Sequence, residues 1–224
     1  FCSSYQNISF NFIHQKERLG LGHAIYQSLI PNSDPILILL GDGIFELDYN
    51  KIISSEISQI GVNRVKDPKR FGIVETDSLK IIKFYEKPIN PPSNLAISGV
   101  YLIRSQKQLY QALKFIIDKN IRTNNEYQLT DALQYMLENG YNFESFKIDE
   151  CLDCGIPESI LKTNKYLLQK LGKNVIHPTA KIINSNISNS TISKDCYIHD
   201  STLNNVIVMP EKSIIKQTLI NEIV

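Results

Sequence analysis

The spacing of large apolar residues near the end of this chain restricts its fold more than any other feature. Beyond residue 174 these residues recur in steps of 6, 5, 5, 6, 5, 5, 6 and 5, with small polar residues between them. The positions are Ile176, Ile182, Ile187, Ile192, Ile198, Leu203, Val208, Ile214 and Leu219. Such a step matches neither the period of an α-helix, about 3.6 residues, nor that of a strand, about 2 residues. The segment is therefore expected to form a repeating structure of its own.

The repeat predicts a short left-handed parallel β-helix over residues 173–224. In such a solenoid each triangular coil has three short strands, and one apolar residue of each strand points inward. Nine inward positions make about three coils. The five-residue steps and the lack of glycine after Gly172 depart from a regular hexapeptide repeat. A β-rich meander is the alternative.

Residues 1–172 alternate between strand-like and helix-like segments, which is typical of an α/β fold. The run 35–40 is apolar throughout, so we expect a strand that is buried on both faces of a parallel sheet. Extended segments are expected at 71–75 and 80–85, joined as a hairpin, and at 96–103. Helical spacing of apolar residues covers 109–117, 129–137 and 157–171.

The composition excludes several classes of protein. The chain has 24 Lys and Arg against 23 Asp and Glu, and a net charge of +1 provides no basic field for nucleic acid or an acidic membrane surface. Its longest apolar run, residues 36–40, is far shorter than the roughly 20 residues that span a bilayer. Four cysteines among 224 residues do not make a disulfide scaffold. With no secretion signal at its start, the chain is expected to be cytoplasmic.

Two acidic turns are candidates for a metal site. Asp42 follows the apolar run 35–40, and Asp153 lies just before the last expected helix. Ligands of open α/β sheets bind beyond the carboxyl ends of strands, and carboxylates can hold Mg²⁺ together with substrate phosphates and water. Each aspartate is equally suited to a plain turn, and their separation of 111 residues does not tell whether they meet. Cys151 and Cys154 are expected to be structural, because zinc needs four ligands and the other two cysteines are isolated.

Other residues are suited to a phosphorylated sugar or a nucleotide. Lys87, beside Glu86 at the end of a strand, can neutralise a phosphate group. Gly20 lets backbone approach a flat ligand, and the Gln15 amide can both donate and accept hydrogen bonds. Glu126 could bind sugar hydroxyls. The alternative for each is a solvated turn or the start of a helix.

The order of the motifs carries more information than each one alone. They are Gln15 with Gly-Leu-Gly-His-Ala24, Leu-Leu-Gly-Asp42, Asp67-Pro-x-Arg-Phe-Gly72, Glu86-Lys87-Pro88, Ile97-Ser-Gly-Val-Tyr101, Glu126-Tyr-Gln-Leu-Thr-Asp131 and Leu152-Asp153-Cys-Gly-x-Pro-Glu-Ser159. This series resembles the sugar-phosphate nucleotidyltransferases, above all the glucose-1-phosphate thymidylyl- and uridylyltransferases. The resemblance covers about residues 12–171. It implies a Rossmann-like mixed sheet with flanking helices, and the left-handed β-helix tail of longer members agrees with residues 173–224.

Enzymes of this family join a nucleoside triphosphate to a sugar 1-phosphate and release pyrophosphate. The resemblance therefore implies this activity, with dTTP or UTP and glucose 1-phosphate favoured as substrates. Carried over by motif position, Asp42 and Asp153 would hold Mg²⁺, and Asp42 would also belong to the nucleotide site. Lys87 would grip the sugar phosphate, and Glu86 beside it would touch the sugar.

The resemblance assigns the remaining site residues to the base and the sugar. Gln15 and Gly20 would read the edge of the nucleobase. Gly72 and Gly99 would leave room for the sugar and offer backbone contacts. Glu126 would accept hydrogen bonds from sugar hydroxyls.

Two departures from the family pattern limit this interpretation. Cys151 stands where the family commonly has an aromatic residue. The glycine-rich loop that cradles the triphosphate, with its Arg and Lys, is nowhere in the chain, which opens at Phe1 without a methionine. We expect an N-terminal segment of perhaps ~80 residues to be missing, and residues 1–224 alone to be inactive.

Three alternatives remain open. The chain could be a non-catalytic relative that senses sugar nucleotides, or another pyrophosphorylase such as a mannose-1-phosphate guanylyltransferase. An acyltransferase or a structural trimer built by the β-helix is disfavoured, because no convincing base accompanies His177 and His199. We expect the triphosphate and the sugar 1-phosphate as partners, with no nucleic acid or membrane. The β-helix makes a homo-oligomer a further expectation.

Overall fold

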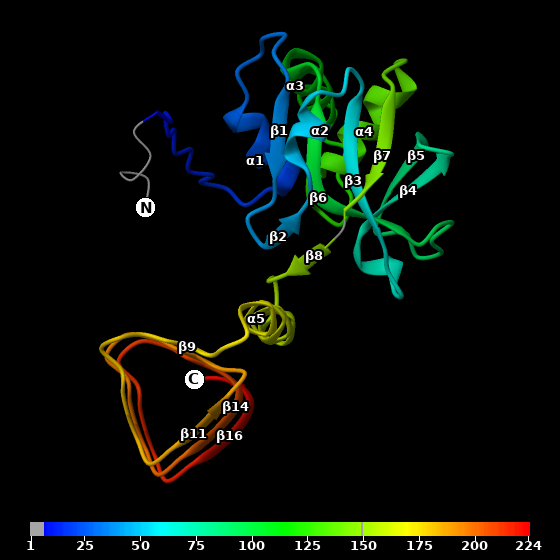
Figure 1. The fold of residues 1–224 in the computed structure, drawn as a ribbon. Coiled ribbons are helices and arrows are strands. Elements are labelled where there is room, and N and C mark those ends of the chain that lie inside the picture. The colour runs from blue at the N-terminus through cyan, green and yellow to red at the C-terminus, as the bar shows by residue number, and fades with distance from the viewer. Residues whose placement is uncertain (1–6, 149) are drawn as a thin grey trace. The chain divides into compact units, whose positions relative to one another are not determined.

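The structure is a computed structural model that describes residues 7–148 and 150–224 (Figure 1). Contacts within the chain separate two compact units. Unit 1 comprises residues 7–40 and 46–148, and unit 2 comprises residues 41–45 and 150–224. This division differs from the one expected from the sequence, with residues 1–172 in one domain and 173–224 in another. The expected boundary marks the start of the repeat, and as a domain boundary it stays a prediction.

Unit 1 is built on a six-stranded mixed sheet in the order β1-β6-β3-β7-β5-β4. Strands β3 and β7 are parallel, and the other pairs within residues 7–148 are antiparallel. A further bridge from β4 to β6 curls the sheet back toward itself. The strands are β1 (Ile36–Leu39), β3 (Ser58–Arg64), β4 (Gly72–Asp77), β5 (Lys80–Glu86), β6 (Leu95–Ile103) and β7 (Phe143–Lys147).

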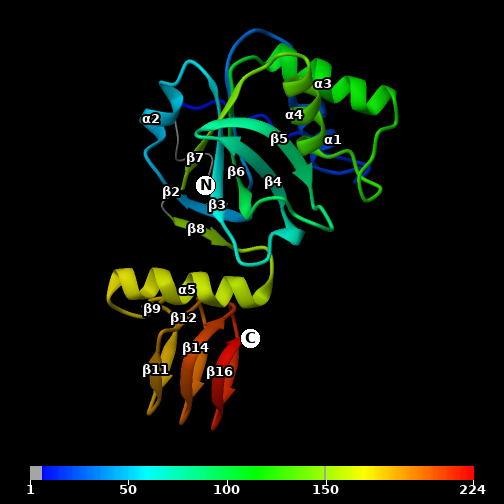
Figure 2. The same cartoon turned by 90° about the vertical axis from the view of Figure 1, so that its right-hand side faces the viewer.

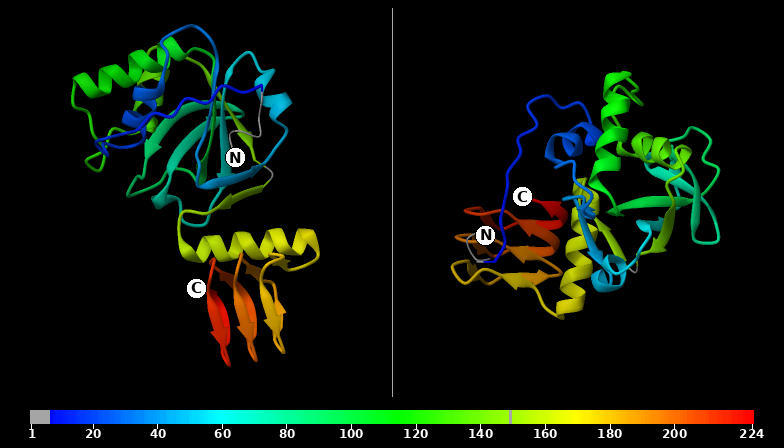
Figure 3. Two further views of the ribbon diagram at one scale, coloured as in Figure 1. Left: turned by 90° about the vertical axis from the view of Figure 1, so that its left-hand side faces the viewer. Right: turned by 90° about the horizontal axis from the view of Figure 1, so that it is seen from above.

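Helices α1, α3 and α4 pack together as a layer against this sheet (Figures 2 and 3). Helices α3 and α4 bury the apolar faces that their spacing predicts, including Leu109 and Leu113 of α3 and Leu129 and Leu133 of α4. A short α2 and a 3₁₀ turn complete the unit. The bounds are α1 (Leu21–Ser28), α2 (Tyr49–Ile53), α3 (Gln106–Asp118), α4 (Leu129–Glu138) and the 3₁₀ turn Pro68–Arg70.

One expectation for the sheet is wrong. Strand β1 was expected inside a parallel sheet, but it is the end strand of the described sheet and pairs antiparallel with β6. Its residues are only partly buried, and Leu39 is 44% exposed. An unbroken apolar run indicates that both faces are apolar, but it carries no information about the direction or number of neighbouring strands. The predicted hairpin, by contrast, forms as β4 and β5 with a tight turn at Ser78.

Unit 2 begins with a two-stranded sheet of β8 (Glu150–Asp153) and β2 (Gly43–Glu46), of which the last residue, Glu46, is counted with unit 1. Helix α5 (Pro157–Leu171) follows, with Pro157 in its first turn and Gly172 in the left-handed conformation at its end. The helix lies along the solenoid (Figure 2), where Thr191 donates a 2.6 Å hydrogen bond to Asn164. None of the described helices is long and apolar enough to cross a membrane.

The solenoid is a parallel β-structure of about three coils with a triangular section (Figure 1). Ile182 pairs with Ile198 and Ile198 with Ile214, so one coil takes 16 residues, the sum of one set of steps of 6, 5 and 5. The fold thus fits the predicted left-handed β-helix. Its strands are β9 (Val175–Ile176), β10 (Lys181–Ile183), β11 (Asn186–Ser188), β12 (Thr191–Ile192), β13 (Tyr197–His199), β14 (Thr202–Val208), β15 (Ser213–Ile215) and β16 (Thr218–Ile223).

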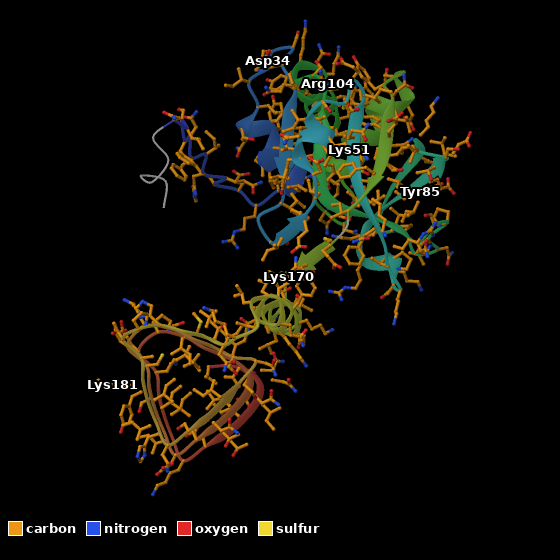
Figure 4. The ribbon with its side chains drawn as sticks, viewed as in Figure 1. Asp34, Lys51, Tyr85, Arg104, Lys170 and Lys181 are labelled. Carbon is orange, nitrogen blue, oxygen red and sulfur yellow. The ribbon has the colours of Figure 1, made fainter. Side chains whose placement is uncertain are left out.

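The interior and corners of the solenoid explain the unusual composition of this segment. The repeated apolar side chains fill the triangle, and Ile198 and Leu203 are fully buried, whereas Lys181 is exposed at the outer surface (Figure 4). Corner residues adopt positive φ angles, a conformation that Asn and Asp tolerate better than other residues with a side chain. They are Asn184, Asn189, Asp195, Asp200, Asn205, Glu211, Lys216 and Asn221. Polar residues therefore form the corners of a segment that contains no glycine.

Candidate functional site

The two aspartates of the expected metal site lie together in unit 2. The Cys154 N–H donates a 2.8 Å hydrogen bond to the Asp42 carbonyl, so the loop after β8 is tied to the loop before β2. A Cβ atom at Gly155 would lie 3.1 Å from Asp153 Oδ1 and 3.6 Å from Asp42 Oδ2. The two carboxylates thus converge on the space that Gly155 leaves open. Thr163 of α5 donates a 3.0 Å hydrogen bond to the Asp153 carbonyl and anchors the end of β8.

This arrangement fits a hard divalent cation. Both donors are carboxylate oxygens on exposed residues, and Mg²⁺ is usually bound by one or two carboxylates together with phosphates and water. Among residues 7–148 and 150–224, no group of three or more His, Cys, Asp and Glu side chains comes together. A site with two protein carboxylates leaves most positions of an octahedron for substrate and water.

Gly72 and Glu86 face each other at the open end of the β4–β5 hairpin in unit 1. A Cβ atom at Gly72 would lie 3.0 Å from Thr130 Oγ1, 3.1 Å from Ile97 Cδ1 and 3.3 Å from Glu86 Oε2. Glycine at this position therefore lets these three side chains, including the Glu86 carboxylate, pack close to the β4 backbone. The structure brings together Gly72, Glu86 and Lys87, and their role in binding a sugar 1-phosphate stays a prediction.

The Glu86 carboxylate is largely withdrawn from water. Its side chain is 7% exposed, and its Oε1 lies 3.5 Å from the Lys87 ammonium. Burial raises the pKa of Glu86 above its usual value, whereas a hydrogen bond from Thr130 and the charge of Lys87 act to lower it. The nearby Asp131 carboxylate acts in the same direction as burial.

Lys87 adopts a strained backbone conformation. Its φ angle is 41°, although the residue before a proline is normally extended. The Lys87 N–H donates a 3.1 Å hydrogen bond to the Phe71 carbonyl, which holds this conformation at the end of the hairpin. Its side chain remains 44% exposed. Strain of this kind is concentrated at functional sites.

The loop that precedes α1 is held by backbone contacts. Gly20 has a φ angle of 104°, and a Cβ atom there would lie 2.7 Å from Glu126 Cβ and 2.8 Å from the Tyr127 carbonyl oxygen. The Gln15 amide nitrogen donates a 3.1 Å hydrogen bond to the Gly20 carbonyl and lies 3.0 Å from His23 Nδ1. Gln15, Gly20 and Glu126 therefore form one group, in which the Gln15 amide has a defined orientation.

Glu126 and Gly99, which the resemblance assigns to the sugar, each have contacts within the protein. The Glu126 side chain accepts a 3.1 Å hydrogen bond from Gln128 and is exposed. Gly99 has a φ angle of 85°, and a Cβ atom there would lie 3.1 Å from Leu40 Cγ. Its immediate effect is thus to let β6 approach Leu40.

Sequence reasoning missed two residues of these groups. Thr130 lies within the Glu126–Asp131 motif, but no pattern singled it out beside Glu86. His23 was expected to pack at the start of a helix, and it also pairs with Gln15. Each contact joins two residues that no local sequence pattern relates to each other.

A comparison with known protein families shows to which family the chain belongs. The nucleotidyl transferase family model matches residues 3–170, three quarters of the chain. The chain belongs to the nucleotidyl transferase family. The six-stranded sheet and its helix layer are thus the described part of a nucleotidyl transferase fold.

Individual relatives of this nucleotidyl transferase chain carry several names. "Bifunctional protein GlmU" of Methanocaldococcus jannaschii is 33% identical over 167 residues, which is 73% of this chain and 39% of the relative. "Low-salt glycan biosynthesis nucleotidyltransferase Agl11" of Haloferax volcanii is 29% identical over 170 residues, which is 72% of this chain and 46% of the relative. The glucose-1-phosphate adenylyltransferase of Clostridium botulinum is 31% identical over 219 residues, 84% of this chain and 55% of the relative. The chain spans about half or less of the length of these curated relatives.

Solved structures share the fold. A UDP-glucose pyrophosphorylase complexed with UDP-glucose has a TM-score of 0.60 at 24% identity, covering 72% of this chain and 66% of that structure. A Bacillus anthracis protein described as a glucose-1-phosphate thymidylyltransferase, in complex with sucrose, has a TM-score of 0.58 at 24% identity, with coverages of 71% and 65%. At this identity the likeness shows the fold alone.

Proposed function

We propose that this chain supplies the sugar-phosphate side and the metal-binding acids of an enzyme that transfers a nucleotidyl group to a sugar 1-phosphate. The convergence of Asp42 and Asp153 on the space beside Gly155 is the observation that carries the proposal. Family membership supports the reaction class. The products are a nucleoside diphosphate sugar and pyrophosphate.

The reaction asks the protein mainly to position substrates and neutralise charge. The phosphate oxygen of the sugar attacks the α-phosphorus of the triphosphate, and pyrophosphate leaves. Lys87 binds the phosphate of the sugar as a point charge, and Glu86 accepts hydrogen bonds from sugar hydroxyls. Gly72 offers its backbone beside Glu86, and Gly99 and Glu126 complete the proposed sugar set.

Asp42 and Asp153 are the residues that would hold Mg²⁺. The cation would neutralise charge on the phosphates and orient them. Two carboxylate donors with room for phosphate oxygens and water suit this ion. Asp42 would in addition contact the nucleotide.

Gln15 and Gly20 are the proposed readers of the nucleobase. The Gln15 nitrogen is engaged by Gly20 and His23, which leaves its carbonyl oxygen oriented as an acceptor. Pyrimidines with an N–H on the edge, as in dTTP and UTP, match such an acceptor. Glucose 1-phosphate is the favoured sugar, and the cytoplasm the favoured compartment.

The test uses the protein together with any residues that its reading frame encodes ahead of Phe1. It is supplied with Mg²⁺, one of dTTP, UTP, CTP, ATP or GTP, and one of several sugar 1-phosphates, and pyrophosphate is measured. We expect turnover with a thymidine or uridine triphosphate, and its loss in Asp42→Asn. Asp195→Asn, an exposed change in the solenoid, is the control and keeps full turnover.

The same panel separates enzyme from sensor. Nucleotide-sugar binding in calorimetry without pyrophosphate from any pair indicates a regulatory relative. Unchanged turnover in Asp42→Asn contradicts the metal assignment. Activity of residues 1–224 alone contradicts the expectation that a separate phosphate-binding segment is required.

A further inference from the structure

We propose that Thr130 is a positioning residue, whose hydroxyl holds the Glu86 carboxylate in the orientation that receives a sugar. The inference rests on the proposed sugar site, and it assigns a role to a residue that touches Glu86 rather than the reacting atoms. Four observations support it: the anchoring of α4, the contacts of the carboxylate, its burial and the charges around it.

The start of α4 is fixed on both sides of Thr130. Before it, the Tyr127 N–H donates to the Leu19 carbonyl and the Gly22 N–H donates to the Tyr127 carbonyl, both at 2.8 Å. After it, the Gln134 side chain accepts a 2.8 Å hydrogen bond from the Phe84 N–H. Phe84 lies two residues before Glu86 on β5, so this hydrogen bond fixes the position of α4 against β5. Thr130 itself is 6% exposed.

The two oxygens of Glu86 have partners on different sides. Oε1 lies 3.5 Å from the Lys87 ammonium. Oε2 and Thr130 Oγ1 border the same point, since a Cβ atom on Gly72 would lie 3.3 Å from the first and 3.0 Å from the second. From this position a hydrogen bond from Thr130 acts to lower the pKa of Glu86. Because the Glu86 side chain is 7% exposed, water offers little replacement for either partner. Loss of the hydroxyl would free the carboxylate to rotate.

The surrounding charges indicate what else the hydroxyl does. Lys87 and Thr130 favour the ionised form of Glu86, and burial and Asp131 oppose it. Asp131 is itself partly buried, and this burial raises the pKa of Asp131, whereas a hydrogen bond from Thr123 acts to lower it. Without Thr130, the balance moves toward a neutral Glu86, which accepts hydrogen bonds from sugar hydroxyls less strongly.

The first measurement follows the titration of Glu86 by carboxyl NMR in three forms of the chain. Thr130→Val keeps the shape of the side chain and removes the hydroxyl, and we expect the pKa of Glu86 to rise further. Thr130→Ser keeps the hydroxyl and serves as the matched control, with an unchanged pKa. An equal pKa in all three forms overturns the inference, provided that the amide spectrum shows an intact fold.

The second measurement is an NMR titration of the same three forms with glucose 1-phosphate. We expect Thr130→Val to weaken binding roughly tenfold and Thr130→Ser to bind as the unaltered chain does. Binding by the unaltered chain that Thr130→Val leaves unchanged overturns the positioning role alone. If the unaltered chain binds no sugar 1-phosphate although the pKa of Glu86 shifts as expected, the proposed sugar site fails and the Thr130–Glu86 contact stands without that role. In the active enzyme, the effect is expected on KM for the sugar 1-phosphate more than on kcat.

Discussion

Replacing Gly155 with alanine would place a methyl group where Asp42 and Asp153 converge. The new Cβ atom would lie 3.1 Å from Asp153 Oδ1, closer than the 3.4 Å at which ordinary contacts begin, and 3.6 Å from Asp42 Oδ2. The Asp153 carboxylate must therefore retreat by a few tenths of an ångström. Because Mg²⁺ demands near-ideal octahedral oxygens at about 2.0–2.1 Å, both this shift and the loss of space for water oppose binding.

We expect the affinity for a divalent cation to fall roughly 10- to 100-fold, which is about 1.4 to 2.8 kcal/mol. Binding of Mn²⁺, which has a spectroscopic signal, is measured by electron paramagnetic resonance on the chain. Gly41→Ala is the matched control, because Gly41 also adjoins Asp42 and its Cβ would meet nothing within 4 Å. Neither glycine has a positive φ angle, so alanine adds no backbone strain. Equal Mn²⁺ affinity in Gly155→Ala and the unaltered chain, or an equal loss in Gly41→Ala, would refute the acid-pair site.

Three further predictions concern the stability of the fold, and one of them also concerns sugar 1-phosphate binding. Burial raises the pKa of Glu86, so the folded chain holds that proton more tightly than the unfolded chain, and stability falls as the pH rises from below 4.5 through the folded value. Glu86→Gln is therefore expected to raise the Tm at pH 7 by a few degrees, about 2–4 °C per kcal/mol, a gain that thermal melts should find absent near pH 4. Lys87→Gly relieves the backbone strain at φ 41° and is expected to stabilise the chain by about 1 kcal/mol, but to abolish sugar 1-phosphate binding. Ser78→Gly is the control: it relieves the strain at φ 56° and should stabilise the chain without loss of binding. Ser201→Ala removes an acceptor of the Gln217 N–H at 3.1 Å and should cost about 1–3 kcal/mol in urea unfolding, whereas the exposed Ser213→Ala should cost almost nothing.

The solenoid is the part of the fold that the sequence determines most fully. Its apolar positions repeat every 16 residues, and the structure stacks them as Ile182, Ile198 and Ile214. The serine corners follow the same interval, since Ser185 accepts from the Ser201 N–H at 3.0 Å. A repeat needs only contacts with the coil before and after it, so local spacing is enough to predict it.

The β4–β5 hairpin and helices α3 and α4 of unit 1 were also predictable, because each rests on a period within one segment. The position of β1 was not. Its apolar run indicates two covered faces, and only the assembled sheet shows antiparallel pairing with β6 and an exposed Leu39. Strand order depends on which segments meet, and no local period records that.

In the candidate site, too, some features follow from the sequence and others only from the tertiary structure. The sequence alone identifies Asp42, Asp153, Glu86 and Lys87 as residue types suited to a cation and a phosphorylated sugar. The tertiary structure alone decides that two aspartates 111 residues apart converge beside Gly155, and that Thr130 reaches Glu86. The reason is physical: a side chain's chemistry belongs to its residue type, whereas its neighbours and its pKa arise from chain segments that only folding brings within a few ångströms.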